Sequence, residues 1–240
     1  MGIIRRYRTA LSRHHRSKGF GIHSPFAFMF VRTVLRERLP YYSYEQIEQL
    51  RHTVSSGRKH PWGQPHLITA KGAKMLFRIV NYFNPKCMMQ IGTNYGVSSA
   101  CMLAVSSSSH LTVYQPDLEQ RQFASRVYAA VGDNVDCFYD LGAAMDRYNE
   151  ELGSTGGKPF LLVNHIPQSR DFDMLTGWLR QLVAAECVVV FRNLVRDQGV
   201  KRLWECVRAT MPHGQTFFNE KTGIIVANPK LQREDFFLWF

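Results

Sequence analysis

The feature that most limits how this chain can fold is the alternation of short apolar segments with longer helical segments between residues 70 and 210. Apolar runs such as Cys87–Ile91 and Cys187–Phe191 are typical of strands that are buried on both faces. Strands that alternate with helices form parallel sheets, because each connection must cross from one end of the sheet to the other. The pattern therefore predicts a doubly wound α/β fold with helices on both faces of the sheet.

The predicted elements are five strand–helix units, with one helix before them and a hairpin after them. The first helix covers residues 70–83. The five strands cover residues 87–91, 111–114, 135–139, 159–163 and 187–191, and the helices after them cover residues 97–105, 119–131, 143–152, 171–184 and 199–210. Two further strands, at residues 216–218 and 223–227, flank a short polar turn that is typical of a hairpin. We therefore expect a sheet of seven strands.

An N-terminal helical region is predicted before this sheet. Its helices cover residues 3–16, 26–38 and 43–55. A polar loop rich in glycine and proline follows at residues 56–65 and is the best domain boundary in the sequence. We therefore expect a basic helical extension at residues 1–60 and an α/β domain at residues 66–240.

Much of the positive charge lies in residues 1–40. The chain has a formal charge of +11 at pH 7, and residues 1–40 contain nine Lys or Arg residues against Glu37 alone. Such a segment could bind an anionic partner, such as nucleic acid, a lipid surface or an acidic protein. It could also be a solvated helical face, since aromatic residues do not alternate with the basic ones as in RNA-binding motifs.

Two features bear on where the protein is located. Its apolar runs are shorter than the roughly 18 residues that cross a bilayer, and no apolar segment follows the arginines of residues 1–8, so we expect neither a membrane span nor a secretory signal. The five cysteines are widely spread and include no CxxC pair. Free thiols of this kind favour a reducing compartment, and we expect a cytoplasmic protein.

The most informative motif is the glycine loop, residues 90–98, where the first predicted strand ends and its helix begins. Its first glycine, Gly92, lets the backbone approach a ligand without a Cβ atom. Doubly wound sheets bind ligands beyond the carboxyl ends of their strands, at the switch point beside the first strand. We therefore expect a cleft around Gly92 and the ends of the neighbouring strands, at Gln115, Asp140 and Asn164.

Four features of the chain resemble those of one bacterial family. They are the order of the elements, the closing hairpin, the glycine loop and the segment Gly-Phe-Gly-Ile-His-Ser-Pro-Phe at residues 19–26. The family is a group of class I S-adenosylmethionine (SAM) dependent methyltransferases related to the small-molecule O-methyltransferases, and the resemblance covers residues 19–240. It implies a Rossmann-like methyltransferase sheet and SAM as the cofactor.

The resemblance also implies which residues surround SAM. Carried over by position, they are Gln90, Gly92, Thr93, Tyr95, Gly96, Ser98, Gln115, Asp117, Asp140 and Asn164. Three of these roles have alternatives: Tyr95 could pack on the next helix, Asp140 could cap a helix, and Asp117 could lie beyond reach of the ribose. His165, after the fourth strand, could act as a general base or be a solvated loop residue.

The chain departs from the family at its acidic positions. Carboxylates of the family fall on Gln90, Gln115 and Asn164, and the acidic pair after the fifth strand falls on Arg192 and Asn193. In the metal-dependent relatives, the carboxylates after the fourth and fifth strands hold a hard cation, which Arg192 would repel. We therefore expect a divergent member of the family without a metal.

Two functions stay open at this point. The first is a metal-independent transfer of a methyl group from SAM to a small or medium acceptor, because positioning can supply most of the rate of such a reaction. The second is a catalytically degenerate methyltransferase fold that acts as a binding or scaffolding module. The missing carboxylates favour the second function, and the glycine loop favours the first.

Overall fold

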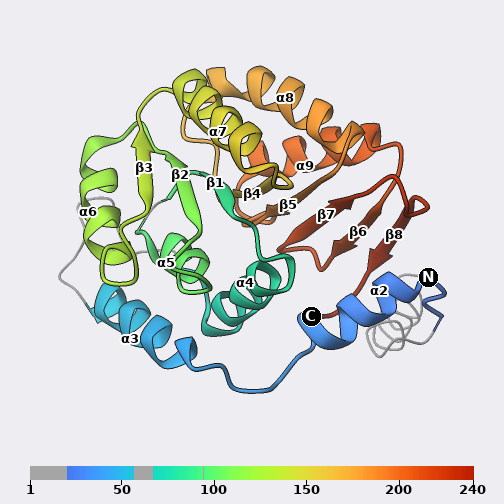
Figure 1. Cartoon of the computed structure of the whole chain (residues 1–240), viewed down its shortest axis with the longest axis horizontal. Helices are drawn as coiled ribbons and strands as arrows, with labels where there is room; N and C mark the ends of the chain where they lie inside the picture. The colour runs from blue at the N-terminus through green and yellow to red at the C-terminus, as the bar shows by residue number, and fades with distance from the viewer. Residues whose placement is uncertain (1–20, 57–66, 94) are drawn as a thin grey trace, which may run out of the picture.

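The structure is a computed structural model that describes residues 21–56, 67–93 and 95–240. The predicted helix at residues 3–16, the loop residue Asn94 and nearly all of the predicted loop at residues 56–65 lie outside the described residues. The described chain folds around one sheet with helices on both sides (Figure 1). This arrangement confirms the predicted α/β class.

The sheet has eight strands in the order β3-β2-β1-β4-β5-β7-β6-β8. In chain order they are β1 Cys87–Ile91, β2 His110–Tyr114, β3 Val135–Phe138, β4 Phe160–Val163, β5 Cys187–Phe191, β6 Gln215–Phe218, β7 Gly223–Ala227 and β8 Glu234–Phe237. The first five pair in parallel, and β7 lies antiparallel between β5 and β6. Since the chain passes from β1 outward to β3 and then returns to β4, the switch point lies beside β1, as predicted.

The predicted count of seven strands was one too low. The additional strand, β8, pairs in parallel with β6 at the edge of the sheet. Its sequence begins with Glu234 and Asp235, so it lacks the apolar run that marks the other strands. An edge strand has hydrogen bonds on one side only and tolerates such charged residues.

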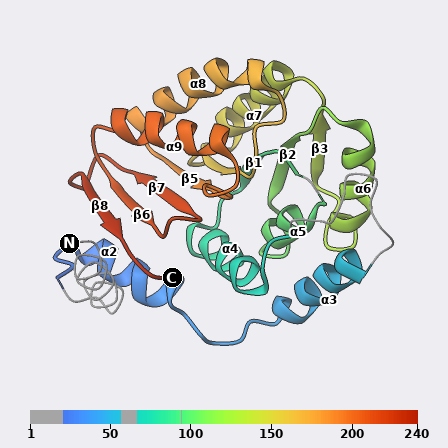
Figure 2. The same ribbon diagram turned by 180° about the vertical axis from the view of Figure 1, so that it is seen from behind.

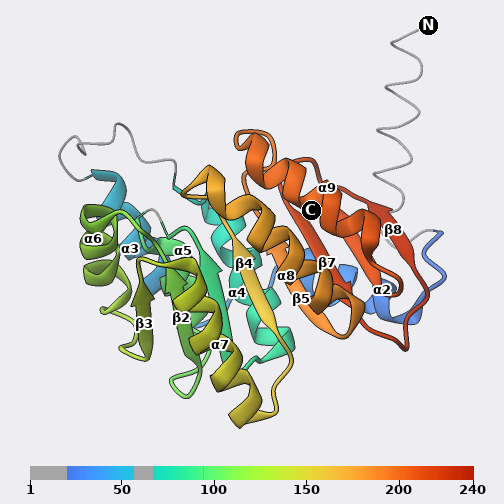
Figure 3. The same ribbon diagram turned by 90° about the horizontal axis from the view of Figure 1, so that it is seen from above.

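The helices form two layers on opposite sides of the sheet (Figures 1 and 3). They are α2 Pro25–Phe30, α3 Ser43–Ser56, α4 Ala70–Phe83, α5 Val97–Leu103, α6 Leu118–Tyr128, α7 Leu141–Thr155, α8 Phe172–Ala184 and α9 Gln198–Thr210. The view from behind shows α7, α8 and α9 together on one face, and α4 and α5 on the other (Figure 2). None of the helices described here is long and apolar enough to cross a membrane.

Each face of the sheet has its own apolar core. Neighbouring residues of a strand point to opposite faces, so Met88 packs with α4 and α5 whereas Met89 packs with α7 and α8. Both methionines are fully buried. Burial on both faces is the physical reason why the central strands are apolar without alternation.

The described part of the predicted N-terminal extension packs on the same core as α4 and α5. The Phe30 ring of α2 lies 4.8 Å from the ring of Phe217 and 5.6 Å from that of Phe83, centroid to centroid. The predicted helix at residues 26–38 ends three residues early. It consists of α2 and a π-helix, η1 Val31–Leu35, that continues it to Leu35. The boundary proposed between residues 60 and 66 lies outside the described residues and stays a prediction.

All five cysteines are free thiols, as expected. Cys101 on α5 and Cys187 on β5 are buried among apolar side chains. Burial raises the pKa of each of these two thiols to about 12, since a thiolate would lose its hydration there. They therefore act as small apolar core residues and not as nucleophiles.

Candidate functional site

The two glycines of the loop have left-handed backbone conformations for different reasons. Gly92 directly follows β1 with φ 72°, and Gly96 precedes α5 with φ 77°. A Cβ atom on Gly96 would lie 2.6 Å from the carbonyl oxygen of Ala124, so close packing on α6 requires a glycine there. A Cβ atom on Gly92 would instead meet the imidazole of His165. Of the two glycines, only Gly92 faces a residue that follows another strand, where the cleft was expected.

A buried network of polar side chains surrounds Gly92. The side-chain amides of Gln90 and Asn164 both donate to the Gly92 carbonyl, each at 3.1 Å. Ser99 donates to Gln90 Oε1 at 3.0 Å and contacts the Thr93 hydroxyl at 2.9 Å. The structure thus brings together three predicted site residues, Gln90, Thr93 and Asn164. The sequence analysis did not predict Ser99 as a site residue. It lies in the first turn of α5, and the spacing of apolar residues along that helix could have shown that it faces the sheet.

Arg192 lies at the centre of the polar end of this cleft. One guanidinium nitrogen donates to Ser98 Oγ at 2.8 Å and to Asn164 Oδ1 at 2.9 Å. Asn193, with φ 63°, donates to the Asn164 carbonyl at 2.9 Å. Burial lowers the pKa of Arg192 to about 10, so the side chain is still a cation at neutral pH.

Arg192 stands at a position where the sequence resemblance leads us to consider a metal site. Asn164 Oδ1 is already used by Arg192, and the remaining amide groups carry no charge to offset the guanidinium. Within the described residues, no group of three or more His, Cys, Asp or Glu side chains could hold a metal ion. A divalent cation between Asn164 and Arg192 would therefore be repelled.

The imidazole of His165 covers the open face of Gly92. A Cβ atom on Gly92 would lie 2.8 Å from His165 Cγ, well inside van der Waals contact. The Nδ1 atom of His165 is buried and has no hydrogen-bond partner among the described residues. Desolvation lowers the pKa of His165 to about 4, an effect that the carboxylate of Asp197 partly opposes. His165 is thus a half-buried residue whose imidazole is neutral at pH 7 and whose Nδ1 atom is shielded from solvent.

The space left between the loop and Arg192 is small. The cavity there has a volume of about 10 Å³, and Tyr95, Ile68 and Asn193 complete its lining. That volume holds about one water molecule, whereas pockets for cofactor-sized ligands enclose roughly 300–1,000 Å³. The Tyr95 ring also packs edge-on against Phe123 of α6, with the ring centroids 5.7 Å apart. This part of the cleft is closed by side chains of the chain itself.

The other predicted cofactor residues lie beyond this network. Gln115 is 1% exposed, and its amide donates to Gln120 Oε1 at 3.2 Å while its oxygen accepts from the Asp117 backbone N–H at 3.4 Å. Asp117 caps α6 by accepting from the Gln120 N–H at 2.8 Å. Asp140 caps α7 by accepting from the Ala143 N–H at 2.9 Å. The capping role considered for Asp140 is therefore present, and no described hydrogen bond joins these residues to the Gly92 network.

Comparison with known proteins identifies the fold. No protein-family model and no curated protein matches the chain in sequence. Among solved structures, the O-methyltransferase from Bacillus cereus in complex with S-adenosylhomocysteine (SAH) superposes with a TM-score of 0.53 at 17% identity, over 81% of this chain and 96% of that one. The O-methyltransferase TomG from Streptomyces achromogenes, involved in tomaymycin synthesis and solved with SAM, gives 0.51 at 18% identity, over 79% and 92%. The chain therefore has the fold of the class I SAM-dependent methyltransferases.

Proposed function

We propose that the protein is a SAM-binding, metal-independent methyltransferase-like protein that acts on a small or medium acceptor. The proposal is carried by the position of Gly92. This residue directly follows the central strand β1, has φ 72° and lies beside a buried polar network. That position is the switch point at which doubly wound sheets bind ligands. The O-methyltransferases that share the fold were solved with SAH and SAM.

Two features of the cleft fit an S-adenosyl group once the His165 ring moves aside. The open face of Gly92 accepts only a ligand atom or a mobile side chain, since no Cβ atom fits there. His165 Nδ1 is a buried acceptor or donor without a partner among the described residues. SAM would supply an electrophilic methyl group. The neutral imidazole of His165 would accept the proton that the acceptor loses.

The other contacts with the cofactor would come from residues at the carboxyl ends of the parallel strands. The loop residues Thr93 and Ser98 would hold the amino-acid part of the cofactor. Gln115 and Asp117 lie after β2 and would hold the ribose, while Asp140 after β3 would lie near the adenine. Because Arg192 occupies the metal position as a cation, methyl transfer here would depend on positioning and not on a Lewis acid.

Calorimetric titration with SAM and with SAH, each with and without Mg²⁺, tests the proposed function. We expect both compounds to bind with dissociation constants below about 1 mM, and Mg²⁺ to leave those constants unchanged. Failure of both compounds to bind at millimolar concentration would rule out the proposed enzyme. Binding that requires Mg²⁺ would contradict the role given to Arg192.

Gln115→Glu should tighten SAM binding about five- to thirty-fold. A carboxylate that accepts from both ribose hydroxyls makes charge-assisted bonds, which are worth roughly 1–2 kcal/mol more than those of a neutral amide. Glutamate keeps the size of glutamine and can still accept from the Asp117 N–H. Gln122→Glu, on the exposed surface of α6, is the matched control and should leave affinity unchanged. Equal effects of the two variants would show that Gln115 does not contact the ribose.

A second function is favoured by the small volume of the closed cavity. If His165 and Arg192 do not move, the fold would serve as a non-catalytic binding or scaffolding module. Its partner would then be an anionic molecule bound through the basic residues of the segment 1–40. The same titrations separate the two functions, because a permanently closed cleft binds neither SAM nor SAH.

A further inference from the structure

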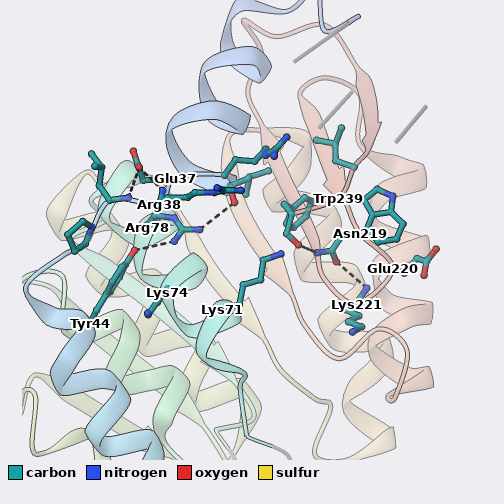
Figure 4. A pocket seen from close by; sticks show the side chains of 16 residues that line it. Glu37, Arg38, Tyr44, Lys71, Lys74, Arg78, Asn219, Glu220, Lys221 and Trp239 are labelled. Atoms are coloured by element: carbon teal, nitrogen blue, oxygen red, sulfur yellow. Dashed lines mark hydrogen bonds between the residues drawn. The ribbon is translucent and has the colours of Figure 1, made fainter. Parts of the chain in front are cut away.

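A large pocket lies away from the glycine loop, between the segment that links η1 to α3, the helix α4, and the C-terminal end of the sheet. Its volume is about 980 Å³, and its walls come from residues 35–40, from α4, from the β6–β7 turn at residues 219–221 and from residues 238–240 (Figure 4). None of its lining residues lines the small cavity beside Gly92. A third cavity of about 480 Å³ lies between the two, since it shares Lys71 and Lys221 with the large pocket and Arg192 with the small cavity. We call the large pocket the basic pocket.

The charge of the basic pocket is strongly positive. Its lining contains six cationic side chains, Arg36, Arg38, Lys71, Lys74, Arg78 and Lys221, against the two carboxylates of Glu37 and Glu220. Figure 4 shows Arg38, Arg78 and Lys74 on one wall, Lys221 on the other and Lys71 between them. A concave surface lined by one sign of charge concentrates the field and attracts ions of the opposite sign.

The carboxylates of the lining neutralise only part of this positive charge. Among the described residues, no carboxylate forms an ion pair with Arg38, Lys71, Lys74 or Lys221. Glu37 accepts with Oε1 from the backbone N–H groups of Arg38 and Leu39 at 2.6 and 2.8 Å, and its carboxylate offsets only part of the positive charge of the lining. The pocket therefore keeps a net positive charge that an incoming anion could balance.

Arg78, a buried cation, forms part of one wall of the pocket. Arg78 is only 7% exposed, and its guanidinium donates to neutral oxygens, at 2.6 Å to Val34 O, 3.1 Å to the Tyr44 hydroxyl and 3.4 Å to Leu35 O. These hydrogen bonds to neutral groups do not cancel the charge of Arg78, which also helps to lower the pKa of the Glu37 carboxyl. These hydrogen bonds hold the positive charge of Arg78 in place in that wall, whereas the flexible side chains of the lysines can adjust to a ligand.

The pocket also offers apolar surface. Trp239 is 57% exposed at one wall, and Leu39 is 66% exposed at the other. The Tyr44 ring lines the floor, with the Lys74 ammonium 5.2 Å from its centre. Planar side chains beside cations suit a ligand that combines a ring with an anionic group.

We propose that the basic pocket binds a small organic anion that carries a phosphate group on a planar, apolar body. The phosphate lies between Lys71 and the cations of one wall, Arg38 and Lys74, and the planar body packs against Trp239. This site goes beyond the proposed methyl transfer, because the residues that line the basic pocket differ from those that line the cavity beside Gly92.

Calorimetric titration of the full chain with 1-naphthyl phosphate, 1-naphthol and inorganic phosphate tests this proposal. We expect 1-naphthyl phosphate to bind more tightly than the other two compounds, because it alone uses both the charge and the apolar surface. Lys71→Gln/Lys74→Gln should weaken its binding about ten-fold or more, the effect of losing one charge-assisted contact. Lys201→Gln, an exposed lysine on α9, is the matched control and should have no effect.

A further variant and a DNA duplex make the outcome of this titration unambiguous. If the double variant fails to fold, Arg38→Gln at an exposed position replaces it, with the same expected direction. Equal affinity for 1-naphthol and 1-naphthyl phosphate, or no change in the pocket variants, would overturn the proposal. A DNA duplex that binds and is lost in the pocket variants, without binding of 1-naphthyl phosphate, would overturn it in favour of a nucleic-acid surface. His165→Ala should leave 1-naphthyl phosphate binding unchanged, which keeps this test independent of the SAM site.

Discussion

Gly96→Ala should lower the free energy of unfolding by about 2–6 kcal/mol. Two costs combine at this position. Alanine is strained at φ 77°, by about 1–3 kcal/mol. Its Cβ atom would also lie 2.6 Å from the Ala124 carbonyl oxygen and 2.9 Å from the Ala124 Cα atom, so the loop and α6 must separate. Backbone atoms cannot rotate away as a side chain can, and this overlap adds roughly 1–3 kcal/mol.

Gly156→Ala is the matched control for that measurement. Gly156 has a similar left-handed conformation, φ 60°, but no atom lies within 4 Å of an added Cβ. Gly156→Ala should therefore lower the free energy of unfolding only by the cost of the left-handed backbone conformation, about 1–2 kcal/mol. Chemical denaturation of both variants gives the comparison. Equal losses of stability would show that the loop does not pack on α6 as described.

The stability of the protein should fall as the pH drops from about 6.5 to about 4, by about 2–3 kcal/mol through His165 alone. Desolvation lowers the pKa of His165 to about 4 in the folded chain, against 6.5 for an ordinary histidine. Between these two values the unfolded chain binds a proton that the folded chain does not. The contribution is therefore fully present above pH 6.5 and is lost as the pH falls toward 4.

The difference between the native protein and His165→Gln isolates this effect from the titration of the carboxylates. Glutamine cannot ionise, so the stability of the variant should depend less on pH in this range. Urea denaturation at pH 7 and at pH 4.5 measures both proteins. Parallel loss of stability in the two proteins would mean that His165 is hydrated and that its ring does not lie buried over Gly92.

The fold could be predicted from the sequence wherever burial alone decides the structure. The strands Cys87–Ile91, Cys187–Phe191 and Gly223–Ala227 and the helix Ala70–Phe83 have the predicted bounds, because each shows a clear apolar pattern. The edge strand β8 shows none and was missed. The helix after Pro25 also ends earlier than predicted, and beyond its end the Glu37 side chain accepts from the backbone N–H groups of Arg38 and Leu39. Apolar periodicity carries no sign of such local hydrogen bonds.

The site could be predicted less completely. Its location followed from topology, since parallel strands bring the residues after β1 and β4 to one edge of the sheet, and Gln90 and Asn164 do meet at Gly92. The closed state of the cleft could not be predicted. It depends on the side-chain conformations of His165 and Arg192, which are set by packing between strands far apart in the sequence.

The central claim is that the cleft at Gly92 takes an S-adenosyl compound when the His165 ring moves away. The most direct test is a calorimetric titration of SAH into the native protein and into His165→Ala. Removal of the ring removes the need to displace it, so we expect SAH to bind the native protein and to bind His165→Ala about ten-fold more tightly. Absence of binding to both proteins at millimolar SAH would contradict the claim and leave the fold without a cofactor site at Gly92.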